Sequence, residues 1–460
     1  MEKRHLEKIH DNLWEVPKSY RGDMHVPARV YTNERMLEAI LRDRSLDQLI
    51  NVATLPGIRK HAIAMPDVHE GYGFPIGGVA AIDPRDGVIS PGGIGYDINC
   101  GVRLLRSTKS FADVEPVLRP LAKALARGVP SGVGRGGPVQ LKAKDLELIL
   151  RDGAARAVAM GYGSQEDLNR IESGGRLGGA DPERVSHAAR ERGRDQLGTI
   201  GSGNHFVEID RVDTIYDEEE AKRFGLVLDG IVVQIHTGSR GLGHQVATDS
   251  IKTMMKAMAR HGISVPDPQL ACAPFRSAEG EGYFAAMSAA ANFAFANRQL
   301  ITAAIRRVWT LDDDELEIIY DVAHNVAKLE RHPDVGEVIV HRKGATRAFP
   351  GQPVLIPGSM GTASYLLVGH ETAMHESFGS SCHGAGRVMS RTKARHEIRH
   401  DDLRTRLEKL GIVAEAGSVK GLVEEAPEAY KDIDAVIDVV ANAGIAKKVA
   451  RFRPIAVVKG

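Results

Sequence analysis

The chain has 460 residues, of which 43% are hydrophobic and 26% are charged, as in a soluble globular protein with a sizeable core. Its 60 basic and 60 acidic residues leave a formal net charge of zero, so contact with nucleic acid would need a local basic patch. Three scattered cysteines exclude a disulfide framework and favour a reducing compartment. Because the sequence shows neither a signal segment nor an apolar run long enough to cross a bilayer, we expect a cytoplasmic protein without a membrane partner.

The N-terminal part of the chain predicts an irregular lead-in, one helix and a polar loop. Residues 1–30 mix charges with prolines, and Thr32 or Asn33 can cap a helix that runs to about Ile50. The motif P-D-V-H-E-G then places Asp67 between a proline and a glycine, where a regular element cannot run far. Polar groups crowded on such a loop indicate a site, although a solvated turn fits this stretch equally well.

The stretch S-P-G-G-I-G-Y-D-I-N-C-G-V-R, residues 90–103, is the densest motif of the chain. Its glycines permit positive φ angles and a close approach of the backbone to another group. Asp97 and Cys100 stand three residues apart in it and offer a hard oxygen and a soft sulfur, which together form half of a metal site. A glycine-rich turn with an inert buried cysteine explains this stretch alone equally well.

Residues 115–195 show mostly helical spacing, interrupted by glycine-rich breaks at 131–137 and 172–179. Since no proline-rich linker marks a boundary, we expect one domain over residues 1–460, with this helical sub-region packed on one side. The helices expected in the sub-region span 115–127, 142–160 and 181–196, and two later helices are expected at 243–261 and 282–309.

Histidines stand at the ends of three expected strands. Strand ends are rigid, so side chains there can be held with the accuracy that metal coordination needs. The glycine-rich turn at 197–209 leads into the first of these strands and also holds Asn204 and Glu208. The histidines are His205, where the first strand begins, His236, after the strand at 230–235, and His324, near the end of the strand at 316–322.

The last third of the chain contains a basic motif and a candidate nucleophile. I-V-H-R-K-G-A-T-R holds Arg342 and Lys343. In S-S-C-H-G-A-G-R, His383 stands at the expected start of a basic helix, and small residues with a helix N-terminus can cradle a phosphate. A histidine beside a bound phosphate can act as a nucleophile, and an incidental histidine in a helix-capping turn is the alternative. The chain ends in an expected strand with Lys459 next to last.

Together, Asp97, Cys100 and the three histidines offer five ligands of mixed hardness, more than one catalytic cation usually takes from a protein. Two cations that share a bridging thiolate would use them all, and paired cations are common in phosphoryl chemistry. Pure thiolate sites favour zinc, whereas mixtures with carboxylate and imidazole also suit manganese or iron. For the whole chain we expect an α+β fold, with mixed sheets around a central cleft.

The motifs G-G-I-G-Y-D-I-N-C-G, G-S-G-N-H-F-V-E, H-T-G-S-R-G and S-C-H-G-A-G-R-V-M-S-R resemble those of the RtcB family of RNA ligases. The likeness extends from P-D-V-H-E-G to the penultimate lysine, which is nearly the whole chain. It implies that GTP guanylylates His383 through a phosphoramidate bond and that two Mn²⁺ ions are bound. It further implies that Asp97, Cys100 and His205 hold one ion, while Cys100, His236 and His324 hold the second.

The resemblance also implies a nucleotide site. Asp67 matches an acidic residue near the metals, and Arg342, Lys343 and Arg387 are candidate contacts to phosphate or RNA, mainly on charge grounds. The residues expected at the nucleotide are Asn204, Glu208, Gly384, Ala385, Gly386 and Arg387, together with Ser364, Tyr430 and Lys459 in the guanine pocket.

The reaction implied by the resemblance joins RNA ends with a 2′,3′-cyclic phosphate or a 3′-phosphate to a 5′-hydroxyl. The cyclic phosphate is first opened to a 3′-phosphate. GMP passes from His383 to that phosphate to give an RNA(3′)pp(5′)G end, and the 5′-hydroxyl then displaces GMP. Members of the family act in tRNA splicing and RNA repair, so broken RNA is the expected partner, and some of them work with an activating protein called archease.

Two other classes of function stay open. A two-metal phosphoesterase or nuclease would use the same ligands with water as the nucleophile, and it would need no adduct on His383. A non-catalytic RNA-binding protein would keep the basic patches but could lose metal ligands, and the intact ligand set argues against this class.

Overall fold

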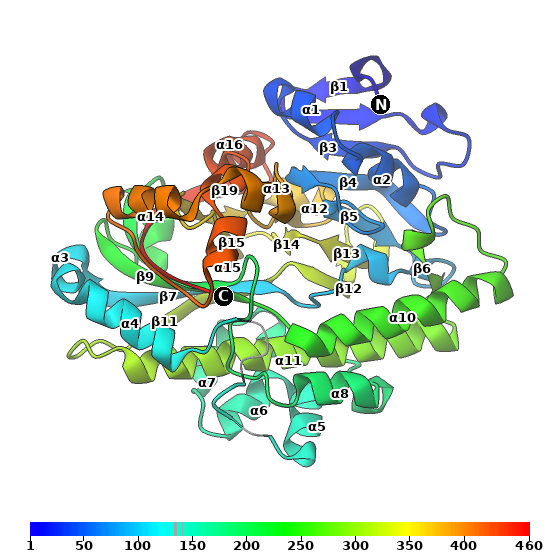
Figure 1. Ribbon diagram of the computed structural model, residues 1–460. Coiled ribbons are helices and arrows are strands. Elements are labelled where there is room, and N and C mark those ends of the chain that lie inside the picture. The colour runs from blue at the N-terminus through cyan, green and yellow to red at the C-terminus, as the bar shows by residue number, and fades with distance from the viewer. Residues whose placement is uncertain (133–135, 140) are drawn as a thin grey trace.

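The computed structural model describes residues 1–132, 136–139 and 141–460, so the centre of the glycine-rich break at 131–137 lies outside the described residues. Two large sheets, sheet I and sheet II, form one body with helices packed around them (Figure 1). The expected α+β class with mixed sheets is therefore confirmed.

Sheet I is buried on both faces, which explains why its central strands are almost continuously apolar. Along β9 (Gly230–Thr237), Val232 packs into the core on one face and Val233 into the core on the other, because successive side chains alternate. In order across sheet I, the strands are β11 (Glu317–Ala323), β7 (Gly101–Ser110), β9, β8 (Phe206–Ile215), β19 (Ala446–Lys459), β16 (Ser364–Gly369) and β15 (Pro353–Ile356), with β18 (Val413–Ala416) beside β19.

Sheet II contains segments that the sequence did not indicate as strands. Residues 1–30, which we expected to be irregular, contribute strands to it. Asp67 lies in strand β4 (Ile58–His69) and not in a loop, because a shift in register between Ala64 and His69 lets the strand accommodate Pro66. In order, the strands are β1 (Glu7–His10), β2 (Leu13–Val16), β3 (Ala28–Tyr31), β4, β5 (Ile76–Ile82), β13 (Gly336–Lys343) and β12 (Asn325–His332).

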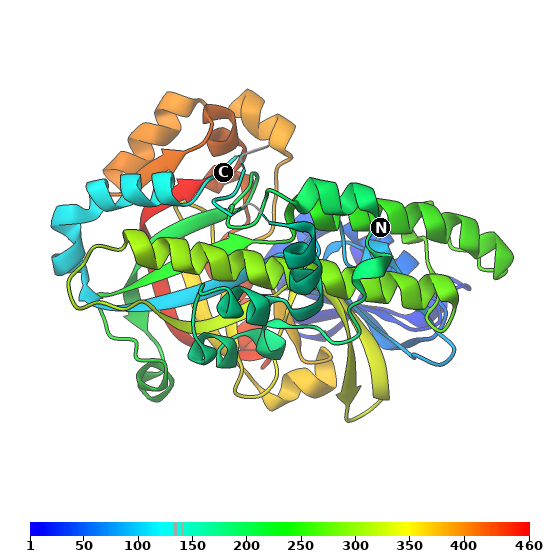
Figure 2. The same ribbon diagram turned by 90° about the horizontal axis from the view of Figure 1, so that it is seen from below.

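Helix α11 (Ala278–Val308) runs beneath the sheets and carries the helical sub-region (Figure 2). Its alanine-rich part is almost fully buried, because small side chains let the neighbouring elements approach closely. The helix expected at 142–160 is broken at Gly153, whose φ is 59°. The elements of this region that pack against α11 are α10 (Arg240–Arg260), α5 (Ala143–Asp152), α6 (Ala154–Ala159) and the 3₁₀ turn η5 (Glu172–Gly175). Helix α8 (His187–Gly193) packs on α10, and α7 (Gln165–Asn169) packs on α6 and η5.

Other expected helices also have different bounds, and the one expected at 181–196 is only α8. The Asn33 side chain accepts from the Met36 N–H (2.9 Å) and caps only α1 (Glu34–Ile40), after which α2 (Ser45–Val52) is a separate helix. The helix expected beside His383 begins later, as α13 (Arg391–Glu397), so His383 lies in an irregular turn. The remaining elements are α3 (Phe111–Val114), α4 (Leu118–Gly128), α9 (Glu218–Arg223), α12 (Glu371–Glu376), α14 (His400–Lys409), α15 (Val419–Glu424), α16 (Ile433–Asn442), β6 (Val88–Ile89), β10 (Ala273–Pro274), β14 (Ala345–Arg347) and β17 (Ser380–Cys382).

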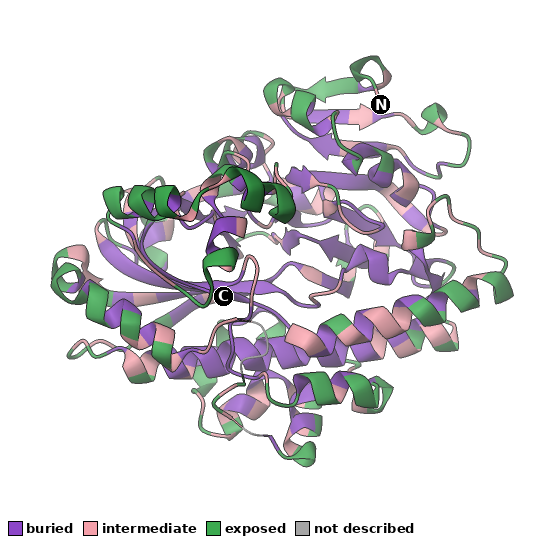
Figure 3. Ribbon diagram, in the orientation of Figure 1, coloured by how far each residue is buried: buried purple, intermediate pink, exposed green. Residues whose placement is uncertain are grey.

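The two sheets are joined at His324. Strand β11 of sheet I ends at Ala323 and β12 of sheet II begins at Asn325, so a single residue stands between them. Buried residues fill most strands of the two sheets, while exposed residues concentrate on the outer helices (Figure 3). In the described residues, every helix lacks the length or the apolar character needed to cross a membrane.

Candidate metal and nucleotide site

One edge of sheet I gathers the expected metal ligands. Neighbouring strands along its main path are antiparallel, so the end of one strand lies beside the start of the next. Gly101 of β7 pairs with Thr237 on one side and with Ala323 on the other. The residues adjacent to these three positions are the expected ligands Cys100, His236 and His324.

Two overlapping triads of possible metal ligands occur in the described residues, each with donor atoms within 4.8 Å of one another. The inner triad is Cys100, His236 and His324, and the outer triad is Asp97, Cys100 and His205. Cys100 Sγ belongs to both, at 3.3 Å from His236 Nε2 and 3.4 Å from His205 Nε2. His236 Nε2 lies 3.2 Å from His324 Nε2, and His205 Nε2 lies 2.9 Å from Asp97 Oδ2.

The chemistry of these donor atoms fits bound cations. Burial lowers the pKa of His236 and of His324 well below 6.5, so both rings are neutral and offer lone pairs. Burial, and then the charge of Asp97, raises the pKa of the Cys100 thiol well above 9, and a cation beside the sulfur would favour the thiolate. Within the described residues, Asp97 Oδ2 accepts no hydrogen bond of good geometry. Lone pairs that face one another in this way could hold a metal ion.

His383 is held by a carboxylate next to the inner triad. Asp67 Oδ2 accepts hydrogen bonds from His383 Nδ1 (2.6 Å), from the His383 backbone N–H (3.0 Å) and from the Gly384 N–H (3.3 Å). Gly386 packs so closely on this strand that a Cβ there would lie 2.1 Å from the Asp67 carbonyl oxygen. The ring centroids of His383 and His324 are 4.9 Å apart. Because Nδ1 is engaged by Asp67, Nε2 is the ring nitrogen that is left for chemistry.

A cavity of about 310 Å³ lies over the inner triad and His383. This volume is at the lower end of the range for small-molecule sites in proteins. It is formed by segments that are far apart in the sequence, since both sheets and the turn after β17 contribute to it. The expected site residues in its lining are Asp97, Cys100, Asn204, His236, His324, Lys343, His383, Gly384, Ala385, Gly386, Arg387, Tyr430 and Lys459.

One wall of the cavity is organised by the buried carboxylate of Glu425. It accepts hydrogen bonds from Arg387 Nη1 (3.0 Å), Arg391 Nε (2.8 Å) and the Tyr430 hydroxyl. Burial raises the pKa of Glu425, but Lys459, Arg391 and Arg387 more than offset this effect, so the net pKa is below its ordinary value. Burial in turn lowers the pKa of Lys459. This wall thus presents charged and phenolic groups in fixed positions.

Glu208 and Ser364 stand behind the cavity lining. Glu208 is buried on the same face of β8 as Phe206, which lines the cavity. Burial, and then the neighbouring Asp210, raises the pKa of Glu208 well above 4.5. Ser364 Oγ accepts a hydrogen bond from the N–H of Gly358 (3.0 Å), which is also a lining residue.

Lys343 and Arg342 are neighbours on β13 and face in opposite directions. Lys343 lines the cavity and donates to the carbonyl oxygens of Tyr72 and of Phe74 (3.1 Å). Arg342 is fully buried on the other face, where it pairs with Glu330 (2.7 and 2.8 Å). Contrary to expectation, the structure does not bring Arg342 to the cavity, because side chains alternate along a strand and only one of two neighbours can face it.

Glu425 and Arg391 are candidate functional residues that the sequence does not reveal. Glu425 follows another glutamate in V-E-E-A-P, and this local pattern is the same as that of a solvated helix end. Its exposed fraction is only 1%, and its two arginine partners, Arg387 and Arg391, stand more than 30 residues before it. A pattern search along the sequence cannot find such a residue, since no local signal separates it from a surface acid.

The geometry defines a class of site, in which two possible cation positions share one cysteine beside a histidine held by a carboxylate. A family model described as tRNA-splicing ligase RtcB matches residues 48–460. The chain is also similar to proteins named tRNA-splicing ligase RtcB from Thermococcus kodakarensis (53% identical), Archaeoglobus fulgidus (51%) and Pyrobaculum aerophilum (50%), with 99% of each chain covered. The protein therefore belongs to the RtcB family.

Proposed function

We propose that the protein is an RNA ligase of tRNA splicing and RNA repair. It joins RNA ends with a 2′,3′-cyclic phosphate or a 3′-phosphate to a 5′-hydroxyl and uses GTP and two Mn²⁺ ions. Family membership and the names of the relatives support the ligase activity and RNA as the substrate. The observation that carries the mechanism is the hydrogen bond between His383 Nδ1 and Asp67, next to the two ligand triads.

His383 is the proposed nucleophile toward GTP. With Nδ1–H donating to Asp67, the Nε2 lone pair attacks the α-phosphorus, a P–N bond forms, and the bond to the departing pyrophosphate breaks. The ring gains positive charge in this step, and the buried Asp67 carboxylate stabilises that charge through the 2.6 Å contact. The adjacent Gly384 and Gly386 leave room for the phosphate beside the ring.

The inner and outer triads are the proposed manganese sites, with the Cys100 sulfur shared between them. Cations bound there would offset the negative charge of the reacting phosphates. The neutral rings of His236 and His324 and the carboxylate of Asp97 are donors that manganese accepts. These residues hold fixed positions because they stand on strand ends and tight turns of sheet I.

Tyr430 and Lys459, ordered by Glu425, form the proposed guanine site, with Ser364 supporting the Gly358 turn. The Lys459 ammonium can donate to the carbonyl oxygen of the base. Asn204, Glu208, Ala385 and Arg387 are the proposed further contacts to the nucleotide.

In the later steps, GMP passes from His383 to the RNA 3′-phosphate, and the P–N bond breaks as a new P–O bond forms. The 5′-hydroxyl of the other RNA end then attacks the phosphorus of the RNA 3′-phosphate. A new P–O bond forms, the bond between the two phosphates breaks, and GMP leaves. Lys343 and Arg387 are the proposed contacts to phosphate within the cavity.

Three further expectations stay predictions. They are an archease partner, a cytoplasmic location and the organisation of residues 1–460 as one catalytic body.

The proposal is tested by incubating the protein with α-labelled GTP and Mn²⁺ and separating it under denaturing conditions. We expect a covalent label that survives alkali and is lost in mild acid, as a phosphoramidate is. Cys382→Ala is the matched control, because it removes the buried thiol next to His383 and should keep the label. Protein without label would contradict the proposal and favour a hydrolase that uses water as its nucleophile.

A further inference from the structure

Arg298 of α11 is a fully buried arginine whose N–H groups reach three different segments. Its Nε lies 2.9 Å from Asp321 Oδ2, and its Nη2 lies 2.9 Å from Asp321 Oδ1. Nη1 donates to two backbone carbonyls, those of Asn99 (2.9 Å) and Thr237 (3.0 Å). Nη2 also donates to Asn99 Oδ1 (3.2 Å). Four of the five N–H groups of the guanidinium donate in these hydrogen bonds, and Nη2 also forms the ion-pair contact with Asp321.

The three segments that Arg298 holds are the three that carry the inner triad. The members of the inner triad stand in or next to three different strands and are far apart in the sequence, so no short stretch of chain fixes the distances between them. One planar fork that binds all three segments supplies such a constraint. Asn99 immediately precedes Cys100, Thr237 immediately follows His236, and Asp321 lies three residues before His324.

The Asn99 turn is tied to α11 a second time. Asn99 has a φ of 53°, and its Nδ2 donates to the carbonyl oxygen of Ala291 (2.7 Å). Ala291 and Arg298 are seven residues apart and therefore lie on the same face of the helix. The space is tight, because a Cβ on Gly101 would lie 3.1 Å from Arg298 Cζ. The turn that holds Cys100 is thus clamped against the helix at both of these points.

We propose that Arg298 is a positioning residue that sets the mutual distances of Cys100, His236 and His324. It acts through backbone carbonyls and the Asp321 carboxylate, and its hydrogen bonds in the described residues do not reach the donor atoms of the triad. Lysine is no substitute, because a single ammonium cannot bind two carbonyls and a carboxylate in the same plane. The inference rests on the proposed role of the triad as a metal site.

Arg103 provides a matched control. It is also fully buried and also binds Asp321, with Nε 2.8 Å from Oδ2. Its other bonds go to side chains of α11, Gln299 Oε1 (2.7 Å) and Thr302 Oγ1 (2.9 Å). Arg103→Lys therefore removes a comparable set of buried hydrogen bonds while it leaves the carbonyls of Asn99 and Thr237 bound to Arg298.

The test compares the metal-free wild type with Arg298→Lys and Arg103→Lys. Manganese affinity is measured by calorimetric titration, and cobalt binding is followed by the absorption of the cobalt–thiolate bond, which reports the geometry around Cys100. We expect Arg298→Lys to lower the manganese affinity at least about tenfold and to change the cobalt spectrum, with Arg103→Lys within about twofold of wild type and spectrally unchanged. Both variants should lose similar stability in urea.

Equal affinities and spectra in the two variants would overturn the positioning role of Arg298. A wild type that binds neither ion would contradict the metal site itself, and with it both this inference and the metal role in the proposed function. If Arg298→Lys does not fold, Asn99→Gly takes its place, because glycine keeps the positive φ but loses the bonds to Arg298 Nη2 and Ala291. A several-fold loss of manganese affinity is then expected, and an unchanged affinity would overturn the inference.

Discussion

Lys343 buries an ammonium group inside the cavity, where its hydrogen bonds among the described residues go to two carbonyl oxygens. Burial lowers its pKa from 10.5 to about 7. Between these two values the unfolded chain binds more protons than the folded protein, so this residue makes the free energy of unfolding rise with pH. The charged form of Lys343 thus destabilises the folded protein. A lysine at such a position fits a role in binding phosphate.

Lys343→Met should therefore stabilise the metal-free protein, and the gain should depend on pH. At pH 6 we expect a gain in the free energy of unfolding on the order of 3 kcal/mol, because the methionine has no charge to desolvate. The gain should shrink as the pH rises through about 7 toward 10. Urea unfolding at pH 6, 8 and 10 measures it, with Lys409→Met on the exposed side of α14 as the control. A gain that is equal at all three pH values would contradict the burial argument.

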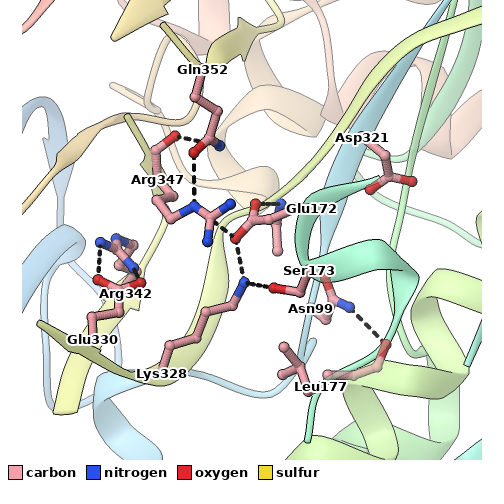
Figure 4. Close-up of polar contacts among 12 residues, drawn as sticks. Asn99, Glu172, Ser173, Leu177, Asp321, Lys328, Glu330, Arg342, Arg347 and Gln352 are labelled. Carbon is pink, nitrogen blue, oxygen red and sulfur yellow. Dashed lines mark hydrogen bonds and ion pairs between the residues drawn. The ribbon is translucent and has the colours of Figure 1, made fainter. Parts of the chain in front are cut away.

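At the scale of the elements, Glu172 in η5 links the helical sub-region to both sheets (Figure 4). Its Oε2 accepts from the Ala323 N–H (3.0 Å), and its Oε1 pairs with Lys328 and lies 3.7 Å from Arg347. Burial raises the pKa of Glu172, but the two cations outweigh it and the net pKa is about 2. Arg347 ends β14, which pairs with β17 just before His383. One buried carboxylate thus supports the backbone on both sides of the site.

Glu172→Gln should destabilise the protein by about 3 to 5 kcal/mol, because it leaves two buried cations without their counter-charge. The double variant with Lys328→Met should recover part of this loss, since one of the unpaired charges is removed as well. Urea unfolding at pH 7 measures both. Glu408→Gln is the control, because it breaks an exposed pair with Arg404 (3.3 Å) and should cost less than about 1 kcal/mol. A small loss of unfolding free energy that is equal in Glu172→Gln and the control would be evidence against a stabilising role of the Glu172 ion pairs.

Periodicity in the sequence predicts the helices and central strands but not where they break. The strand at β9 and the long helix α11 follow from apolar pattern and alanine content. The break at Gly153 and the passage of β4 through Pro66 depend on tertiary contacts. Local propensity is a weak guide in such places, because packing of distant segments decides the backbone conformation.

At the scale of the whole molecule, the site exists only where distant segments meet. The five expected metal ligands lie together in the two triads, and each belongs to a recognisable motif next to a strand end or a glycine turn. Glu425 and Arg298 could not be found in this way, since their importance comes from partners far away in the chain. The burial of Arg342 could not be predicted either, because its position next to Lys343 in the sequence does not reveal which face of the strand it occupies.

Strand β19 carries Lys459 to the cavity from the far end of the chain. Lys459 pairs in register with Phe206, and its Nζ lies 5.2 Å from the centroid of that ring. Lys459→Met should lower guanylylation about tenfold and reduce the preference for GTP over ATP, because a charged donor to the base is lost. Labelling with α-labelled GTP and ATP measures both effects. The control is Lys447→Met, on the exposed end of the same strand, and equal labelling of the two variants would contradict a role of Lys459 at the base.

The central claim is that His383 carries GMP, and ligation by His383→Ala tests it most directly. The variant should form no adduct and should fail to join a 3′-phosphate end to a 5′-hydroxyl. It should still seal a presynthesised RNA(3′)pp(5′)G end, because that step needs the metal ligands and the cavity but no histidine nucleophile. Parallel assays of the two RNA substrates with the same preparation separate loss of the nucleophile from loss of the fold. Ligation of the 3′-phosphate end by His383→Ala, or labelling of this variant with GMP, would contradict the claim.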